Sequence, residues 1–171
     1  EFFDVVLRGV GTPDDLPRVR YAIAGLDGMH DAPVWPPPGA QPRETYLTTN
    51  SRLVNHAPGI DGDLTWTHDP DHPVPSPVDN AFAFLAEFPD ERWLADRDDV
   101  LTFTAEPVDA PVVLAGPVEL GVTIASSGPE IDLFARLCDV APDGAAHRIA
   151  GGQLTLHDAT GTILLATTST S

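Results

Sequence analysis

The serines are the first candidates for chemistry in this sequence, because a serine hydrolase needs a serine hydroxyl that a histidine activates. In α/β-hydrolases this serine lies at the centre of a Gly-x-Ser-x-Gly turn. The available residues are Ser51, Ser76, Ser126, Ser127, Ser169 and Ser171. None of them has glycine both two residues before it and two residues after it. The glycine after Ser127 is typical of a turn. We therefore predict no catalytic residue in this chain.

A stretch rich in acids and histidines is the second candidate, here for metal binding. It holds Asp61, Asp63, His68, Asp69, Asp71 and His72. Asp61 and Asp63 begin the pattern of a calcium loop, but Trp66 stands where such a loop requires its turn glycine. His68 and His72 are spaced for one helix face, but Pro70 between them disfavours a helix. The stretch predicts a solvated acidic loop, with no metal site, and we expect no cofactor.

Three tryptophans, Trp35, Trp66 and Trp93, could recognise a sugar by stacking on a pyranose ring. Tryptophan more often anchors a core or an interface, because it buries a large apolar area. A free-standing carbohydrate-binding module is therefore kept as the alternative function.

The charge of the chain excludes several partners. Its 171 residues carry 9 arginines, no lysine and 26 acids, for a formal net charge of −17. Nucleic acid and anionic membrane surfaces would repel such a chain, and no apolar run approaches the roughly 20 residues that span a bilayer. The single cysteine, Cys138, excludes an intrachain disulfide and lies in an alternating segment typical of a buried structural thiol. The sequence shows no secretion signal, so we expect a cytoplasmic protein, although the compartment is not established.

The hydrophobic pattern predicts a chain made mainly of β-strands. Apolar residues at positions 2, 3, 6 and 7, followed by Gly9, predict a short amphipathic helix. Strands are expected at 19–24, 45–49, 64–68, 100–104, 112–115, 118–125, 133–140, 153–157 and 162–167. One short helix is expected within 80–95, where Pro89 limits its length. Many short strands with turn residues between them predict an all-β fold, an antiparallel sandwich or jelly roll.

Residues 97–107 (RDDVLTFTAEP), 114–120 (LAGPVEL) and 125–144 carry a specific resemblance. They resemble the C-terminal β-sandwich of the family of X-Pro dipeptidyl peptidases, cocaine esterases and α-amino acid ester hydrolases. Residues 35–40 and 69–75 match earlier loops of that domain, and residues 2–9 resemble the last helix of the family's α/β-hydrolase domain. The resemblance implies a galactose-binding-like jelly roll at 13–171, preceded at 1–12 by the end of a hydrolase domain.

The resemblance also implies that this chain has a non-catalytic function. The family's nucleophile, acid and histidine lie in the hydrolase domain, and nothing here matches them. Trp66-Thr67-His68 lacks the glycines and the proline of the family's catalytic-histidine motif, so we assign no role in catalysis to it. The family adds further strands after the segment that corresponds to 139–144, whereas here residues 149–152 run directly into 153–158. The sequence thus predicts a non-catalytic domain that stabilises an α/β-hydrolase domain and helps to wall its pocket, for ester or X-Pro peptide substrates.

Four residues are the candidates for that pocket or interdomain surface: Phe2, Phe3, Trp35 and Trp66. A helix as short as 2–8 is not stable alone in water, so its apolar side needs a surface to cover it. In the isolated chain we expect this side either to pack back on the sandwich or to drive self-association into a homo-oligomer.

Overall fold

The structure, a computed structural model, describes residues 2–59, 62–78, 80, 82, 89–157 and 160–168. These residues form antiparallel β-sheets with one short α-helix, which confirms the predicted all-β class. The helix is α1 (Phe2–Arg8), and two 3-10 helices are η1 (Pro13–Asp15) and η3 (Arg92–Asp96). The strands are β1 (Val19–Tyr21), β2 (His30–Ala32), β3 (Tyr46–Leu47), β4 (Leu53–Val54), β5 (Pro117–Ala125), β6 (Glu130–Val140), β7 (Ala146–His157) and β8 (Thr160–Thr168).

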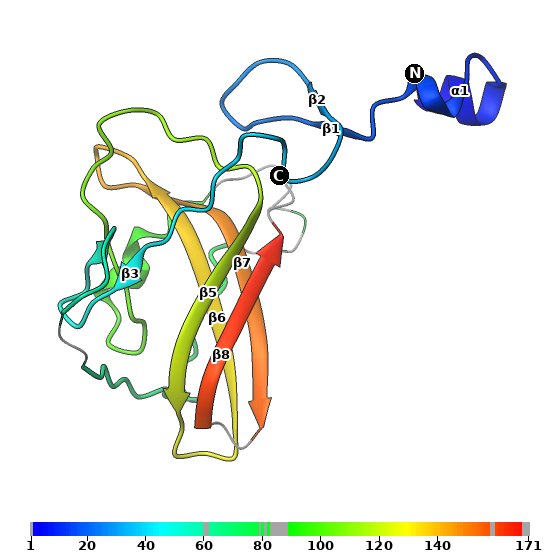
Figure 1. Ribbon diagram of the computed structural model, residues 1–171. Coiled ribbons are helices and arrows are strands. Elements are labelled where there is room, and N and C mark those ends of the chain that lie inside the picture. Colours follow the sequence, from blue (N-terminus) through cyan, green and yellow to red (C-terminus); the bar gives the residue numbers. More distant parts are fainter. Residues whose placement is uncertain are drawn as a thin grey trace.

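The four long strands form two antiparallel pairs, β5 with β8 and β6 with β7 (Figure 1). The pair β5–β8 keeps an unbroken register from Pro117 opposite Thr168 to Ala125 opposite Thr160. The pair β6–β7 has a register shift between Leu137 and Cys138. In Figure 1 the two pairs lie one in front of the other, and β7 contacts β8. Closure of these pairs into a jelly roll stays a prediction.

Period-2 alternation decides which side chains these strands turn inward. On β5 every second residue is half-buried, from Val118 to Ile124, whereas its other residues are exposed. On β6 and β7 the half-buried Ile131 and Leu133 lie opposite Leu156 and Leu154. The opposite face is exposed: there the Glu130 carboxylate lies 2.8 Å from His157 Nδ1, and Phe134 is 68% exposed. The half-buried apolar residues of β5, and those of β6 and β7, therefore lie on one face of their strands.

This core is thinly covered. Among the described residues, the buried apolar ones are Ala32, Val78, Ala145 and Ala150. The chain exposes 13117 Å² of surface, whereas a compact folded protein of its mass exposes about 8,100 Å².

The helix α1 confirms the predicted N-terminal helix. It ends before Gly9, which adopts a left-handed φ of +65°, and the Val10 N–H then donates to the Asp4 carbonyl at 3.0 Å. Arg8 also donates to the Asp4 carboxylate at 2.7 Å. Figure 1 shows α1 extending away from the β-strands, and none of its residues is buried. The helix therefore does not pack back on the sheets.

Several strand predictions are wrong. Residues 64–68 form no strand, although Leu64 and Trp66 are half-buried and Thr65 and Thr67 exposed. The alternating burial of these residues arises because one side of the extended chain packs against the protein, although its backbone forms no β-ladder. Residues 112–115 form no strand, and Val112 to Leu114 are about half exposed.

Two other segments differ in part from the prediction. In 100–104 only Thr104 makes a bridge, to Arg52. Of the helix predicted within 80–95, residues 81 and 83–88 lie outside the described residues, and η3 covers its end.

Candidate functional site

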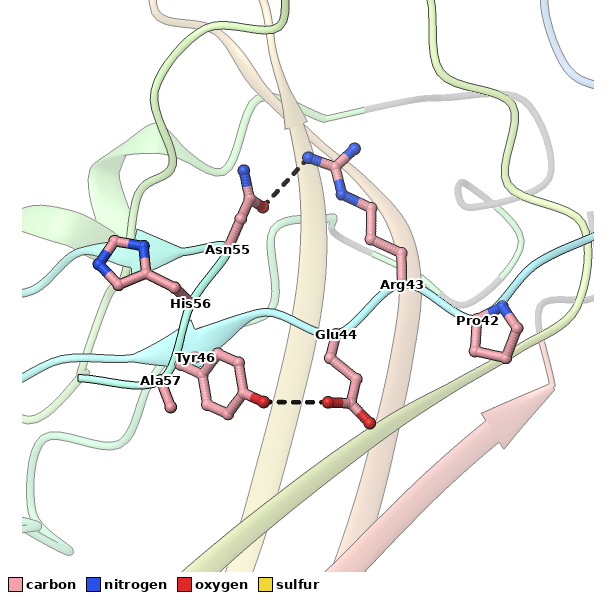
Figure 2. Close-up of a pocket in the computed structure, with 7 residues that line it drawn as sticks. All are labelled: Pro42, Arg43, Glu44, Tyr46, Asn55, His56 and Ala57. Carbon is pink, nitrogen blue, oxygen red and sulfur yellow. Dashed lines mark hydrogen bonds between the residues drawn. The ribbon is translucent and has the colours of Figure 1, made fainter. Parts of the chain in front are cut away.

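A hollow of about 540 Å³ lies beside β3 and the chain that follows β4 (Figure 2). It is lined by Pro42, Arg43, Glu44, Tyr46, Asn55, His56 and Ala57. Its polar groups largely pair with one another: the Tyr46 hydroxyl donates to Glu44 Oε2 at 2.9 Å, and Arg43 Nη2 donates to Asn55 Oδ1 at 3.2 Å. The Glu44 carboxylate also raises the pKa of Tyr46, so the phenol stays protonated. This hollow is a polar surface depression and holds no activated nucleophile.

Trp35 is built into an aromatic cluster. Its ring meets Tyr21 edge to face at a centroid distance of 5.3 Å, and Tyr21 lies 5.4 Å from the ring of His30. The hairpin β1–β2 positions Tyr21 opposite His30. Trp35 nevertheless remains 38% exposed, so the cluster covers only part of its side chain.

The loop that carries Trp35 is fixed against the beginning of β5. A Cβ added to Gly116 would lie 3.3 Å from Pro36 Cγ, and the φ of Gly116 is +155°. A side chain at this position would push the proline away, so glycine permits the close approach. The start of β5 therefore supports the exposed tryptophan.

Phe2 and Phe3 lie on α1 in an edge-to-face pair at a centroid distance of 5.5 Å. They are 59% and 69% exposed, and Val6 and Leu7 on the same helix are also more than half exposed. Figure 1 places α1 and the β1–β2 hairpin at the same end of the molecule, beyond the start of β5. We call the exposed apolar residues of α1 together with Trp35 the apical surface.

The structure does not bring Trp66 into this surface. Within the described part of the chain, no aromatic ring contact joins Trp66 to Trp35. Trp66 and Trp93 are both half-buried, as expected for packing anchors. Of the four candidate residues, Phe2 and Phe3 thus lie on α1, Trp35 lies in the loop after β2, and Trp66 lies in extended chain outside any strand.

The acidic stretch forms an exposed turn. Asp69 accepts the backbone N–H of Asp71 at 3.0 Å, and its other oxygen lies 2.8 Å from His72 Nδ1. Contact with His72 and the Asp71 N–H lowers the pKa of Asp69. Asp61 lies outside the described residues. Over the residues that the structure describes, no three acidic, histidine or cysteine side chains converge to hold a metal ion.

Sequence reasoning missed a buried ionic contact beside β6 and β7. Glu91 is 2% exposed, and Arg136 Nη1 donates to its Oε2 at 3.1 Å. The neighbouring Asp90 accepts the Ala146 N–H at 2.9 Å, and the Glu91 N–H donates to the Ala146 carbonyl at 2.8 Å. Burial and the Glu91 carboxylate raise the pKa of Cys138, so that thiol stays protonated. We call residues 90–92, together with their partners Arg136 and Ala146, the clasp. In the sequence, the only local indication of this contact is the run Asp-Glu-Arg after Pro89.

The described residues define a β-domain of antiparallel strand pairs with one short helix. A family model described as the X-Pro dipeptidyl-peptidase C-terminal non-catalytic domain matches residues 11–162. The chain belongs to this family, which confirms the resemblance found in the sequence.

Two relatives show how large the whole proteins are. The chain is 32% identical to a cocaine esterase from Rhodococcus sp. (strain MB1 Bresler), over 88% of this chain and 28% of the relative. An aminopeptidase structure from a marine sediment archaeon, Thaumarchaeota archaeon, matches with a TM-score of 0.80 at 22% identity, over 96% of this chain and 32% of that one. The chain thus spans less than a third of each, and the structural match concerns the fold alone. No helix in the described residues is long and apolar enough to cross a membrane.

Proposed function

We propose that this domain serves an X-Pro dipeptidyl peptidase-like or acyl-ester serine hydrolase, where it stabilises the α/β-hydrolase domain and helps to wall its substrate pocket. The observation that carries the proposal is the exposure of the apical surface, with Phe2 and Phe3 more than half exposed and Trp35 38% exposed. The family match begins at residue 11, after α1, which supports assigning residues 1–12 to the end of the hydrolase domain and 13–171 to the accessory domain.

The energetics agree with docking of this surface. Burying a phenylalanine or leucine side chain contributes roughly 1.5–3 kcal/mol, and four exposed apolar residues of α1 offer this contribution to a partner. Domain interfaces within one chain commonly bury 600–1,500 Å². In this proposal Phe2 and Phe3 dock on the hydrolase domain, whereas Trp35 lies at the edge of the substrate pocket of that domain. Trp66 supports the domain from within.

The test uses the complete hydrolase that carries this domain. Replacing Phe2 and Phe3 by serine should lower its melting temperature by about 2 °C or more, because the docked helix loses apolar burial. Trp35→Ala should raise KM for p-nitrophenyl esters or Gly-Pro-p-nitroanilide at least threefold and change kcat less. Val34→Ala is the control, because Val34 is the preceding residue on the same loop and is also exposed, at 54%. If both variants behave like the control, the apical surface neither docks nor lines the pocket.

A carbohydrate-binding module remains the second candidate. It is favoured by one observation, the partial exposure of Trp35 in its aromatic cluster. Fold alone does not establish sugar binding.

A further inference from the structure

The hollow beside β3 holds two opposite charges that do not pair with each other. Arg43 Nη2 donates to the neutral amide oxygen of Asn55 at 3.2 Å, and the Glu44 carboxylate accepts from the neutral Tyr46 hydroxyl at 2.9 Å. Over the part of the chain that the structure describes, no ion pair involves either charge. A guanidinium has five N–H donors and a carboxylate has about four acceptor positions. Both groups therefore keep hydrogen-bonding capacity for a ligand.

An arginine without a carboxylate stands out in this chain, which has 26 acids and 9 arginines. At least six of the arginines lie within ion-pair distance of a carboxylate: Arg8, Arg20, Arg52, Arg92, Arg97 and Arg136. The planar fork of a guanidinium matches the two oxygens of a carboxylate. Asn55 holds one nitrogen of Arg43, so the other N–H groups are available to a carboxylate from outside the chain.

The positions of the two charges select the length of the ligand. Figure 2 shows the Arg43 and Glu44 side chains on opposite sides of the segment that leads into β3. A free amino acid carries its ammonium and its carboxylate on one carbon, so it cannot reach both side chains at once. An extended peptide spans about 3.3–3.6 Å per residue, so a peptide of about three residues can lie across this segment. The volume of the hollow, about 540 Å³, is in the usual range for small-molecule sites.

We propose that this hollow binds a short peptide with free ends, its C-terminal carboxylate on Arg43 and its N-terminal ammonium on Glu44. Pro42 and Ala57 line the same hollow and offer apolar surface to the middle of the peptide. The formal net charge of −17 repels a simple carboxylate, whereas a peptide of neutral side chains with both ends free has no net charge. The site uses neither α1 nor Trp35, so it is separate from the docking role proposed above.

The test titrates the 171-residue chain with trialanine in about 0.15 M salt, which screens the net charge beyond roughly 8 Å. Calorimetry measures the affinity, and NMR shifts of the Asn55 and His56 amides locate the binding. Three probes control for the ends of the peptide. N-acetyl-trialanine lacks the ammonium, trialanine amide lacks the carboxylate, and free alanine has both charges on one carbon.

Single-charge variants test the two ends of the site. Arg43→Gln and Glu44→Gln each remove one charge, and Arg18→Gln is the matched control, because Arg18 is exposed and is not among the lining residues. All three positions are exposed, and an unchanged melting temperature shows that each variant is folded.

The expected result is saturable binding of trialanine with a Kd of about 1 mM and no saturable binding of alanine. Each blocked peptide should bind about fivefold more weakly, near the upper end for the loss of one exposed ion pair. Arg43→Gln should weaken trialanine by a similar factor and leave trialanine amide unchanged. Glu44→Gln should weaken trialanine likewise and leave the acetylated peptide unchanged.

Absence of saturable binding, equal binding of the free and blocked peptides, or an equal loss in Arg18→Gln would overturn the proposal. Binding that depends on Arg43 but not on Glu44 would also overturn it, because the site would then accept any carboxylate. Since the assay contains no hydrolase domain, such a failure is independent of the Phe2, Phe3 and Trp35 variants that test the proposed function.

Discussion

The guanidinium of Arg136 on β6 donates a 3.1 Å hydrogen bond to the carboxylate of Glu91, whose side chain is 1% exposed. Glu91 lies 45 residues earlier in the chain, so this contact ties the segment before η3 to the middle of the β6–β7 pair. The other oxygen, Oε1, is buried without a hydrogen-bond partner. The buried negative charge of Glu91 is therefore stabilised mainly by Arg136.

Removal of that cation should therefore destabilise the fold. We expect Arg136→Ala to lower the free energy of unfolding by about 3 kcal/mol, near the low end for a broken buried pair, because Arg136 is a quarter exposed. The double variant Glu91→Gln and Arg136→Met should recover most of this loss, since it leaves no buried charge unpaired. Urea unfolding followed by tryptophan fluorescence measures both. A double variant as unstable as Arg136→Ala would show that the contact does not act through charge.

The clasp also makes stability depend on pH through Asp90. The Ala146 N–H, and then the Arg92 N–H, lower the pKa of Asp90 from 3.8 to about 2 in the folded chain. A carboxylate with a lowered folded-state pKa stabilises the fold above its unfolded-state pKa, and the contribution is lost as the pH falls through the folded value. We therefore expect the stabilisation by Asp90 to be complete above about pH 4 and to decline toward pH 2.

Asp90→Asn isolates this contribution. The variant keeps a side-chain oxygen for the Ala146 N–H but no longer titrates. Its urea midpoint should lie below that of the wild type at pH 6, and the difference should shrink between pH 4 and pH 2. Parallel curves over that range would contradict the assignment.

The parts of this fold that the sequence predicted are those with local causes. The helix α1 follows from apolar spacing and from Gly9, and β5 follows from strict alternation between Val118 and Ile124. The strand β2 was missed because Asp31 lies at its centre; Arg20 on β1 holds that carboxylate in a two-pronged ion pair, with distances of 2.7 and 3.0 Å. Such pairing depends on a partner 11 residues away and leaves no local pattern.

The candidate site divides in the same way. The short amphipathic helix that carries Phe2 and Phe3 could be predicted, whereas the sequence left open whether its apolar side packs back on the sheets. The support of Trp35 by Tyr21 and by the approach of Pro36 to Gly116 could not, since it arises only when the β1–β2 hairpin meets the start of β5. The clasp was missed for the same reason.

The exposed indole of Trp35 separates the two candidate functions. If Trp35 belongs to an interdomain surface, galactose, xylose and their oligosaccharides should show no saturable binding to the chain. Calorimetry and tryptophan fluorescence provide the measurement, with Trp35→Ala as the control for any signal. A dissociation constant below about 1 mM that is lost in Trp35→Ala would favour the carbohydrate-binding module instead.

The exposed apolar side of α1 should drive self-association of the isolated chain. Because no residue of α1 is buried, replacing Phe2 and Phe3 by serine should leave the melting temperature within about 1 °C of the wild-type value. The same variant should lower the fraction of dimer in sedimentation experiments, since it removes the aromatic pair that a second helix would cover.

Salt should strengthen association of the wild type, because screening weakens the repulsion between chains of net charge −17. Phe134→Ser is the matched control: Phe134 is 68% exposed on β6, outside α1, and its loss should leave the dimer unchanged. If the Phe2 and Phe3 variant sediments like the wild type at every salt concentration, α1 is a passive segment and the docking role proposed for it fails.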